Sequence, residues 1–219
     1  MKKEELIRKL VDEFVAKLVV LLETELPDRG TTATGSESPR LSSKILAELI
    51  SHEGIVLEAY KDSVGVWTWG IGVTDASGHR VGRYKDNPQS LHRVVEVFEW
   101  LVRTRYLPSV LSAFKKELTD EQLAAALSFH YNTGAIGRAS WVKSFNEGEI
   151  EKARAEFMNW RSPASIINRR EKERNLFFDG TWSNTGKALL YTAVNKPSYT
   201  PRWSSAEEID ITEVLHGFG

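Results

Sequence analysis

The stretch HEGIVLEAYKDSVGVWTWGIG, residues 52–72, decides the fold of this chain. It places a glutamate at position 53, an aspartate nine residues later at 62, and a threonine six residues after that at 68. The run from Val66 to Trp69 has strand propensity. The glycines at 65, 70 and 72 indicate turns or close approaches of the backbone. We therefore expect a short β structure that carries three polar side chains at fixed offsets.

The helix expected before this stretch positions Glu53. Ser42 or Ser43 can cap a helix that runs through about His52, with a predicted buried face made of Ile45, Leu46, Leu49 and Ile50. Gly54 follows just past the end of this helix. Glu53 then lies at the negative end of the helix dipole, which disfavours an ionised carboxylate, and burial would act in the same direction. Both effects suit a general acid that must hold its proton near neutral pH.

Asp62 and Thr68 are candidates for activating a water or stabilising charge beside the acid. Asp62 lies in a polar turn and would stay ionised, so it could act as a base, orient a water or stabilise positive charge. The Thr68 hydroxyl could hold a water between itself and Asp62. Taken singly, Glu53 could be a surface charge, Asp62 a turn former and Thr68 an ordinary strand residue. Their joint spacing favours glycoside hydrolysis, which needs two carboxyl groups in different environments.

The composition excludes several classes of function. The chain has 219 residues, enough for one sizeable domain with appendages, and 41 % of them are apolar. Its formal net charge of −1 argues against a nucleic-acid-binding protein, whose domain is usually strongly basic. The lack of cysteine excludes disulfides and thiolate chemistry. The histidines show no metal-ligand spacing, so we expect no metal and no cofactor.

The chain divides into four predicted parts. Residues 1–27 have the apolar spacing of an amphipathic helix, and residues 28–40, rich in Thr, Ser and Gly, form a flexible linker. The main domain is predicted over 41–195, and 196–219 are expected to be a C-terminal tail because they contain two prolines and several polar residues. No apolar run reaches the length of a membrane span, and acidic residues near the start argue against a secretory signal.

The second half of the main domain is predicted to be helical. The pattern becomes helical at His92, and Pro108 is expected to break or kink it. Thr119 with Gln122 forms a capping box that opens a further helix. Two more helices are predicted, over 149–160 and 166–178. A small β part among helices is an α+β arrangement.

The segment from Glu53 to Gly72 resembles the catalytic signature of the phage-type lysozymes, glycoside hydrolase family 24, which are endolysins that cut the glycan strand of peptidoglycan. Two segments further along the chain add to the likeness. Residues 118–134 resemble the central-helix region of the family, and residues 168–182 resemble its C-terminal arginine and Gly-x-Trp segment. The resemblance covers about residues 41–190.

The resemblance implies a lysozyme-like fold, mainly helical, with a small β lobe and a cleft between the lobes. It implies that Glu53 is the general acid and that Asp62 and Thr68 match the family's aspartate and threonine. Arg169 falls on an arginine that lies near the acid and could pair with it, although a solvated helix face is the alternative for this residue. Asn132 and Tyr60 are further candidates for binding substrate or tuning the acid.

The sequence departs from the family pattern at two positions. Val73 stands where the family often has a histidine, which removes a helper near the aspartate. Trp69 stands where a smaller aliphatic residue is more usual, and we expect it to reshape the floor of the cleft. His52, next to the acid, is interpreted as a helix-end residue, with tuning of Glu53 as the alternative.

The activity that the resemblance implies is hydrolysis of the β-1,4 bond between N-acetylmuramic acid and N-acetylglucosamine, with inversion favoured because a threonine could hold the attacking water. A lytic transglycosylase is one alternative, and it would attack with a hydroxyl of the sugar itself. A non-catalytic wall-binding or phage structural module is another. The presence of both Asp62 and Thr68 beside Glu53 argues against these alternatives.

The expected partner is bacterial peptidoglycan, with no nucleic acid and no metal. Such an endolysin would be made in the host cytoplasm and would reach the wall through holes made by a separate protein. The N-terminal helix would pack on the main domain, mediate self-association, or dock to a membrane surface, another phage protein or a virion. Both signs of charge on its polar face weaken the membrane alternative.

Overall fold

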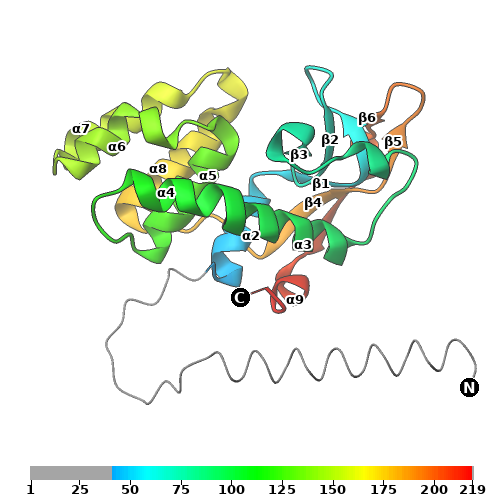
Figure 1. The fold of residues 1–219 in the computed structure, drawn as a ribbon, viewed down its shortest axis with the longest axis horizontal. Helices are drawn as coiled ribbons and strands as arrows, with labels where there is room; N and C mark the ends of the chain where they lie inside the picture. The colour runs from blue at the N-terminus through cyan, green and yellow to red at the C-terminus, as the bar shows by residue number, and fades with distance from the viewer. Residues whose placement is uncertain (1–40, 219) are drawn as a thin grey trace, which may run out of the picture. The chain divides into compact units, whose positions relative to one another are not determined.

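The computed structural model describes residues 41–218, so the predicted N-terminal helix (1–27) and linker (28–40) lie outside the described residues. Within the described part, helices gather in one lobe and most strands in a smaller one (Figure 1). The expected α+β class is therefore confirmed. Among residues 41–218, no helix is long and apolar enough to cross a membrane.

The predicted helices are present with small shifts at their ends, whereas the short helices over 140–146 and 212–215 were not predicted. The α-helices are α2 (Ser43–Ser51), α3 (Leu91–Leu101), α4 (Leu107–Ala113), α5 (Asp120–Thr133), α6 (Ser140–Asn146), α7 (Ile150–Phe157), α8 (Ile167–Asp179) and α9 (Thr212–Leu215). The strands are β1 (Gly54–Lys61), β2 (Trp67–Gly70), β3 (Val73–Thr74), β4 (Lys187–Tyr191), β5 (Val194–Asn195), β6 (Thr200–Pro201) and β7 (Ala206–Asp210).

The caps of α2 and α5 show how local chemistry fixes the helix ends. The hydroxyl of Ser42 accepts a 3.3 Å bond from the Ile45 N–H and so satisfies one of the free donors of the first turn of α2. Thr119 and Gln122 form the predicted capping box at the start of α5. Gly134 ends α5 in the left-handed conformation, which glycine adopts without strain.

The sequence predicts that Pro108 breaks or kinks the helical run, but the chain remains helical on both sides of the proline. Helix α3 passes through a π-helical turn, Val102–Tyr106, directly into α4. The proline lies in the first turn of α4, where its missing N–H is least needed. The result is one long rod, α3 followed by α4, that runs past both lobes (Figure 1).

The main sheet has five strands in the order β3-β2-β1-β4-β7. β1 and β2 form an antiparallel hairpin whose register is shifted by a bulge between Val56 and Tyr60. β4 runs parallel to β1 and pairs with it from Gly54 to Val56. A strand from the end of the chain therefore lies directly beside the residue that follows Glu53.

The prediction that residues 196–219 form a C-terminal tail is wrong. β7 pairs with β4 along its whole length, and the side chains of Ile211 and Leu215 are buried. The domain predicted to end at 195 continues to the end of the described chain. The reason is that β7 is an edge strand, held by backbone hydrogen bonds and mostly exposed, so its side chains carry no alternating apolar pattern.

Trp69 belongs to the core of the β lobe, and its expected effect on the floor of the cleft stays a prediction. Its ring is completely buried and stacks on Tyr84 with centroids 3.8 Å apart, while its indole N–H donates to the Leu57 carbonyl at 2.9 Å. Val73, the other departure from the family pattern, is buried as well. Both residues therefore stabilise the lobe from inside.

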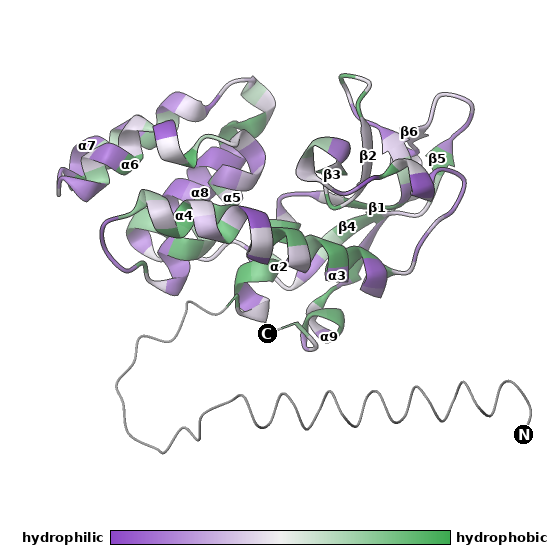
Figure 2. Ribbon diagram, in the orientation of Figure 1, coloured by the Kyte–Doolittle hydropathy of each residue, from purple (hydrophilic) through white to green (hydrophobic). Residues whose placement is uncertain are grey.

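The helices differ in polarity, and α8, a more polar helix than α2 or α3, contains buried charges. Apolar residues concentrate in α2 and α3, whereas α8 is largely hydrophilic (Figure 2). Two charged residues of α8, Arg170 and Glu173, are nevertheless completely buried. Buried charges require partners, so α8 must supply or find compensating groups inside the protein.

Candidate functional site

Glu53 lies in the two-residue connection between α2 and β1. Its backbone N–H donates to the carbonyl of Ile50 at 3.0 Å, which holds the connection against the last turn of α2. The side chain is 21 % exposed, so its carboxyl is shielded from bulk water but reachable from outside. This is the position at a helix end that the sequence predicts.

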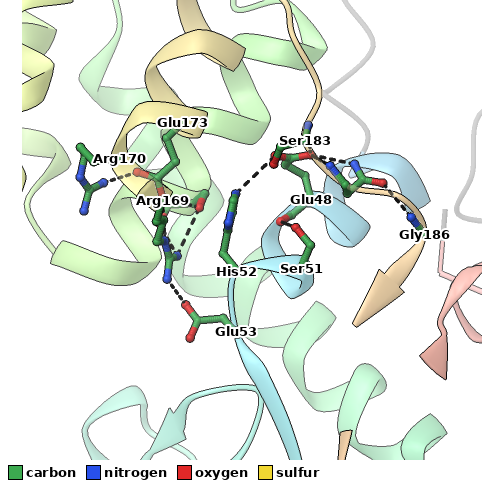
Figure 3. A network of polar contacts seen from close by, with 11 residues as sticks. Glu48, Ser51, His52, Glu53, Arg169, Arg170, Glu173, Ser183 and Gly186 are labelled. Atoms are coloured by element: carbon green, nitrogen blue, oxygen red, sulfur yellow. Dashed lines mark hydrogen bonds and ion pairs between the residues drawn. The ribbon is translucent and has the colours of Figure 1, made fainter. Parts of the chain in front are cut away.

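The structure brings Arg169 against Glu53. Arg169, in the first turn of α8, donates from Nη1 to Glu53 Oε1 at 2.6 Å (Figure 3). The arginine side chain is only 11 % exposed, so the alternative of a solvated helix face does not hold. The same guanidinium donates from Nη2 to the backbone carbonyl and the hydroxyl of Ser128, both at 3.2 Å. Arg169 is thus held between α5, α8 and the start of β1.

Glu173 is the centre of this network. It accepts from Arg169 Nε at 2.9 Å and from the Ser128 hydroxyl at 2.6 Å, and it also pairs with Arg170. The sequence analysis missed Glu173 and Ser128. The spacing of Arg169 and Arg170 from Glu173, four and three residues along one helix, was the available signal for Glu173.

The charges of the network act on one another. Burial works against the charged form of Arg169, but Glu53 and Glu173 outweigh it, and the pKa of Arg169 is raised. For Arg170 burial prevails over the attraction of Glu173, and its pKa is lowered. Arginine keeps its charge at any physiological pH, so Glu53 always faces a cation that Glu173 shares.

Asn132 lies at the end of α5 and joins the network from the far side. Its side-chain oxygen accepts from Arg170 Nη2 at 2.6 Å. The bonds that connect it to Glu53 run through Arg170, Glu173 and Arg169. In the structure Asn132 is therefore a support for Arg170, and a direct contact with substrate stays a prediction.

The turn after β2 closes around the other oxygen of Glu53. Gly72 has a φ of +69°, and a Cβ added there would lie 3.6 Å from Glu53 Oε2 and 3.4 Å from the Tyr131 ring. The Tyr131 hydroxyl donates to the carbonyl of Ile71, which fixes the turn against α5. Only glycine adopts this conformation readily, so the backbone can approach the carboxyl closely.

Tyr60 feels the charges of both candidate carboxylates, Glu53 and Asp62. It lies in β1 opposite Thr68 of β2. Burial raises the pKa of Tyr60, and the charges of Glu53 and Asp62 and the nearby Tyr191 raise it further. The Tyr60 hydroxyl therefore lies within electrostatic reach of Glu53 and Asp62 and remains a hydrogen-bond donor over the working pH range.

Asp62 and Thr68 both shape the hairpin. Asp62 Oδ1 accepts from the N–H groups of Val64 at 3.0 Å and Val66 at 2.8 Å, which is the turn-forming use of an aspartate. These two bonds leave Oδ2 for other partners. Thr68 is 3 % exposed and donates its hydroxyl to the Val66 carbonyl at 3.2 Å. Its oxygen can still accept a bond from a water.

His52 faces away from the acid. Its Nε2 lies 3.3 Å from Glu48 Oε1, and its ring points toward Glu48 while the Glu53 side chain points toward Arg169 (Figure 3). Glu48 is completely buried and also accepts four hydrogen bonds from Ser183 and Asn184, at 2.6–3.1 Å. The cluster fastens the end of α2 to the chain that leads into β4, so His52 is a helix-end residue with a structural partner.

Comparison with known proteins identifies the family. A family model described as phage lysozyme matches residues 50–173, more than half of the chain. The endolysin of Bacillus phage PZA is 28 % identical over 178 residues, which cover 75 % of this chain and 63 % of that protein. The endolysin of Acyrthosiphon pisum secondary endosymbiont phage 1 is 30 % identical over 151 residues, 63 % of this chain and 97 % of that protein. This chain thus spans less than two thirds of the PZA endolysin.

Solved structures share the fold. The endolysin from Escherichia coli O157:H7 phage FAHEc1 aligns with a TM-score of 0.60 and 24 % identity, over 68 % of this chain and 99 % of that chain. The muramidase domain of SpmX from Asticaccaulis excentricus aligns with a TM-score of 0.54 and 22 % identity, over 64 % of this chain and 99 % of that chain. The family match covers Glu53, Asp62, Thr68 and Arg169, and this chain belongs to the phage lysozyme family.

Proposed function

We propose that this protein is a peptidoglycan hydrolase that cleaves the β-1,4 bond between N-acetylmuramic acid and N-acetylglucosamine. The observation that carries the proposal is the setting of Glu53. Its carboxyl is partly exposed and is enclosed by Arg169 and the Gly72 turn, and the hairpin that follows it carries a second carboxylate, Asp62. Two carboxyl groups in unlike surroundings are what glycoside hydrolysis requires.

In the proposed reaction Glu53 gives its proton to the oxygen that leaves the anomeric carbon. Arg169 then stabilises the carboxylate that this transfer creates, because the 2.6 Å contact is already formed. Glu173 also accepts from Arg169, so the positive charge of the arginine is divided between two carboxylates and repels the Glu53 proton less before the transfer. In this proposal the Arg169–Glu173 pair tolerates the protonated form of Glu53 before the transfer and stabilises its ionised form afterwards.

Asp62 completes the reaction in this proposal. A water attacks the anomeric carbon and gives its proton to Asp62, whose Oδ2 is not used by the turn, and the Thr68 oxygen helps to hold that water. One displacement by water inverts the anomeric centre. Proton NMR of the fresh product, before mutarotation, would show the α-anomer, whereas the β-anomer would establish retention.

The decisive experiment digests purified peptidoglycan with the wild type and with Glu53→Gln, followed by mass analysis of the released fragments. We expect hydrolytic ends that carry reducing N-acetylmuramic acid from the wild type, and a loss of rate of about 10²-fold or more in the variant. Glu171→Gln, an exposed glutamate on α8, is the matched control and should retain activity. Ends with a 1,6-anhydro sugar would mean a transglycosylase, and no release by the wild type would mean a non-catalytic module.

We also propose a route to the substrate. The protein acts on the wall of a bacterial host after a separate protein has permeabilised the membrane, and residues 1–27 mediate self-association or docking to another phage protein. Light scattering of the full chain beside a shortened chain that begins at Ser38 tests the self-association. If both proteins have the same number of chains per particle, self-association through residues 1–27 is contradicted.

A further inference from the structure

The C-terminal strands lie beside the proposed acid although they fall outside the stretch that matches the family, residues 50–173. β4 pairs in parallel with β1 at Gly54, the residue that follows Glu53. β7 pairs with β4 and extends the sheet further. The sheet that carries Tyr60 and Thr68 therefore continues past the reaction centre into these strands (Figure 1).

Tyr191, the last residue of β4, reaches back to the site. A Cβ added to Gly54 would lie 2.7 Å from Cε2 of the Tyr191 ring, so the ring lies close against the backbone next to Glu53. Tyr191 is also close enough to Tyr60 to raise the pKa of that residue, together with Glu53 and Asp62. Tyr191 thus lies beside Gly54, the residue that follows Glu53.

Trp203 continues the aromatic surface outward. Its ring stands nearly perpendicular to that of Tyr191, with centroids 5.2 Å apart, and the residue is 68 % exposed. Because its indole is this exposed, the protein does not gain the roughly 2 kcal/mol of free energy that burying such a side chain would supply.

The backbone that presents Trp203 is nevertheless well held. The backbone N–H of Arg202 donates to the Ala193 carbonyl at 2.9 Å. The Ser205 hydroxyl donates to the Arg202 carbonyl at 2.7 Å and accepts from the Ala193 N–H at 3.2 Å. The backbone at Trp203 is therefore held in place, and an exposed indole next to a tyrosine ring offers a contact surface.

We propose that Tyr191 and Trp203 form a sugar-binding subsite that extends the glycan path beyond the bond that is cleaved. The occupant is a pyranose ring of the peptidoglycan glycan strand. The indole of Trp203 packs on the C–H face of the ring, and the Tyr191 hydroxyl bonds its polar edge. The inference rests on the proposed function, since a continuous glycan is what such a path would follow, and the continuity with Glu53 runs through Gly54.

The test uses the full chain with Trp203→Ala and, as the matched control, Trp100→Ala. Trp100 is also exposed, at 45 %, but lies on α3 beside His79. Binding of β-1,4-linked N-acetylglucosamine oligomers of increasing length is measured by calorimetry in the Glu53→Gln background, and KM and kcat are measured on polymeric peptidoglycan. We expect Trp203→Ala to weaken binding of the longest oligomers by about fivefold and to raise KM rather than lower kcat, with short oligomers affected least.

The outcomes separate the two proposals. Cleavage by the wild type with Trp203→Ala equal to Trp100→Ala in KM and in oligomer binding would overturn the subsite and leave the hydrolase intact. Absence of cleavage by the wild type, with oligomer binding that depends on Trp203, would overturn the hydrolase and support the sugar-binding surface. Absence of both cleavage and Trp203-dependent binding would overturn both.

Discussion

Glu53 and Arg169 are 116 residues apart in the chain and are joined by a 2.6 Å bond between Oε1 and Nη1. Both side chains are mostly shielded from bulk water, since Glu53 is 21 % and Arg169 is 11 % exposed. The pair connects the start of the sheet to helix α8. Through Glu173 it also connects to Arg170 and the end of α5.

Replacing Arg169 with Gln tests the partner of the proposed acid. The change removes the stabilisation of the Glu53 carboxylate and leaves Glu173 with one arginine fewer. We expect activity to fall by about 10²-fold and the free energy of unfolding to fall by about 3 kcal/mol. Peptidoglycan turnover and urea unfolding measure the two effects. A variant as active as the wild type would show that the pair is only structural.

Replacing Glu173 with Gln separates the positioning of Arg169 from its charge. The whole charge of Arg169 would then act on Glu53 and favour its ionised form. We expect the alkaline limb of the pH–activity profile to move to lower pH, a readout that lost stability alone would not shift. Glu171→Gln, exposed on the same helix, is the control. An unmoved limb would contradict the sharing of Arg169 by the two glutamates.

Glu48 predicts a specific dependence of stability on pH. Burial alone would raise its pKa, but hydrogen bonds from His52, Ser183 and Asn184 lower it from 4.5 to about 2. A lowered pKa in the folded state means that the stabilisation is complete above about pH 4.5 and is lost as the pH falls toward 2. The contribution at pH 7 is on the order of 3 kcal/mol.

The measurement is the free energy of unfolding of the wild type and of Glu48→Gln between pH 3 and pH 7. We expect the gap between the two proteins to narrow as the pH falls below about 4.5. Glu151→Gln, an exposed glutamate on α7, should show no such convergence. A gap that stays constant with pH would contradict the role of the Glu48 carboxylate.

Gly54 and Tyr191 should behave as a coupled pair. An alanine at 54 would place a Cβ 2.7 Å from the Tyr191 ring, so Gly54→Ala should destabilise the protein by about 2 kcal/mol. Tyr191→Ala removes the obstacle, and the double variant should lose less than the sum of the two single changes. Thermal unfolding of all four proteins measures the coupling. Additive losses would show that β4 adjusts freely beside Glu53.

Much of the fold was predictable because its signals are local. Ser42, the Thr119–Gln122 capping box and the turn glycines act on backbone groups within a few residues. The edge strand β7 was not predictable, since backbone pairing with β4 holds it and its side chains are mostly exposed. Pro108 does not end the helical run because it lies in the first turn of α4, where its missing N–H is tolerated.

The sequence by itself determined the spacing of Glu53, Asp62 and Thr68, the helix that precedes them and the hairpin that carries them. Only the tertiary structure decided that Arg169 meets Glu53, that Glu173 stands behind both arginines, and that Tyr191 covers Gly54. The physical reason is the range of the interactions. Caps, turns and periodic apolar faces depend on neighbours in the chain, whereas ion pairs and parallel strand pairing depend on which surfaces the packed core brings together.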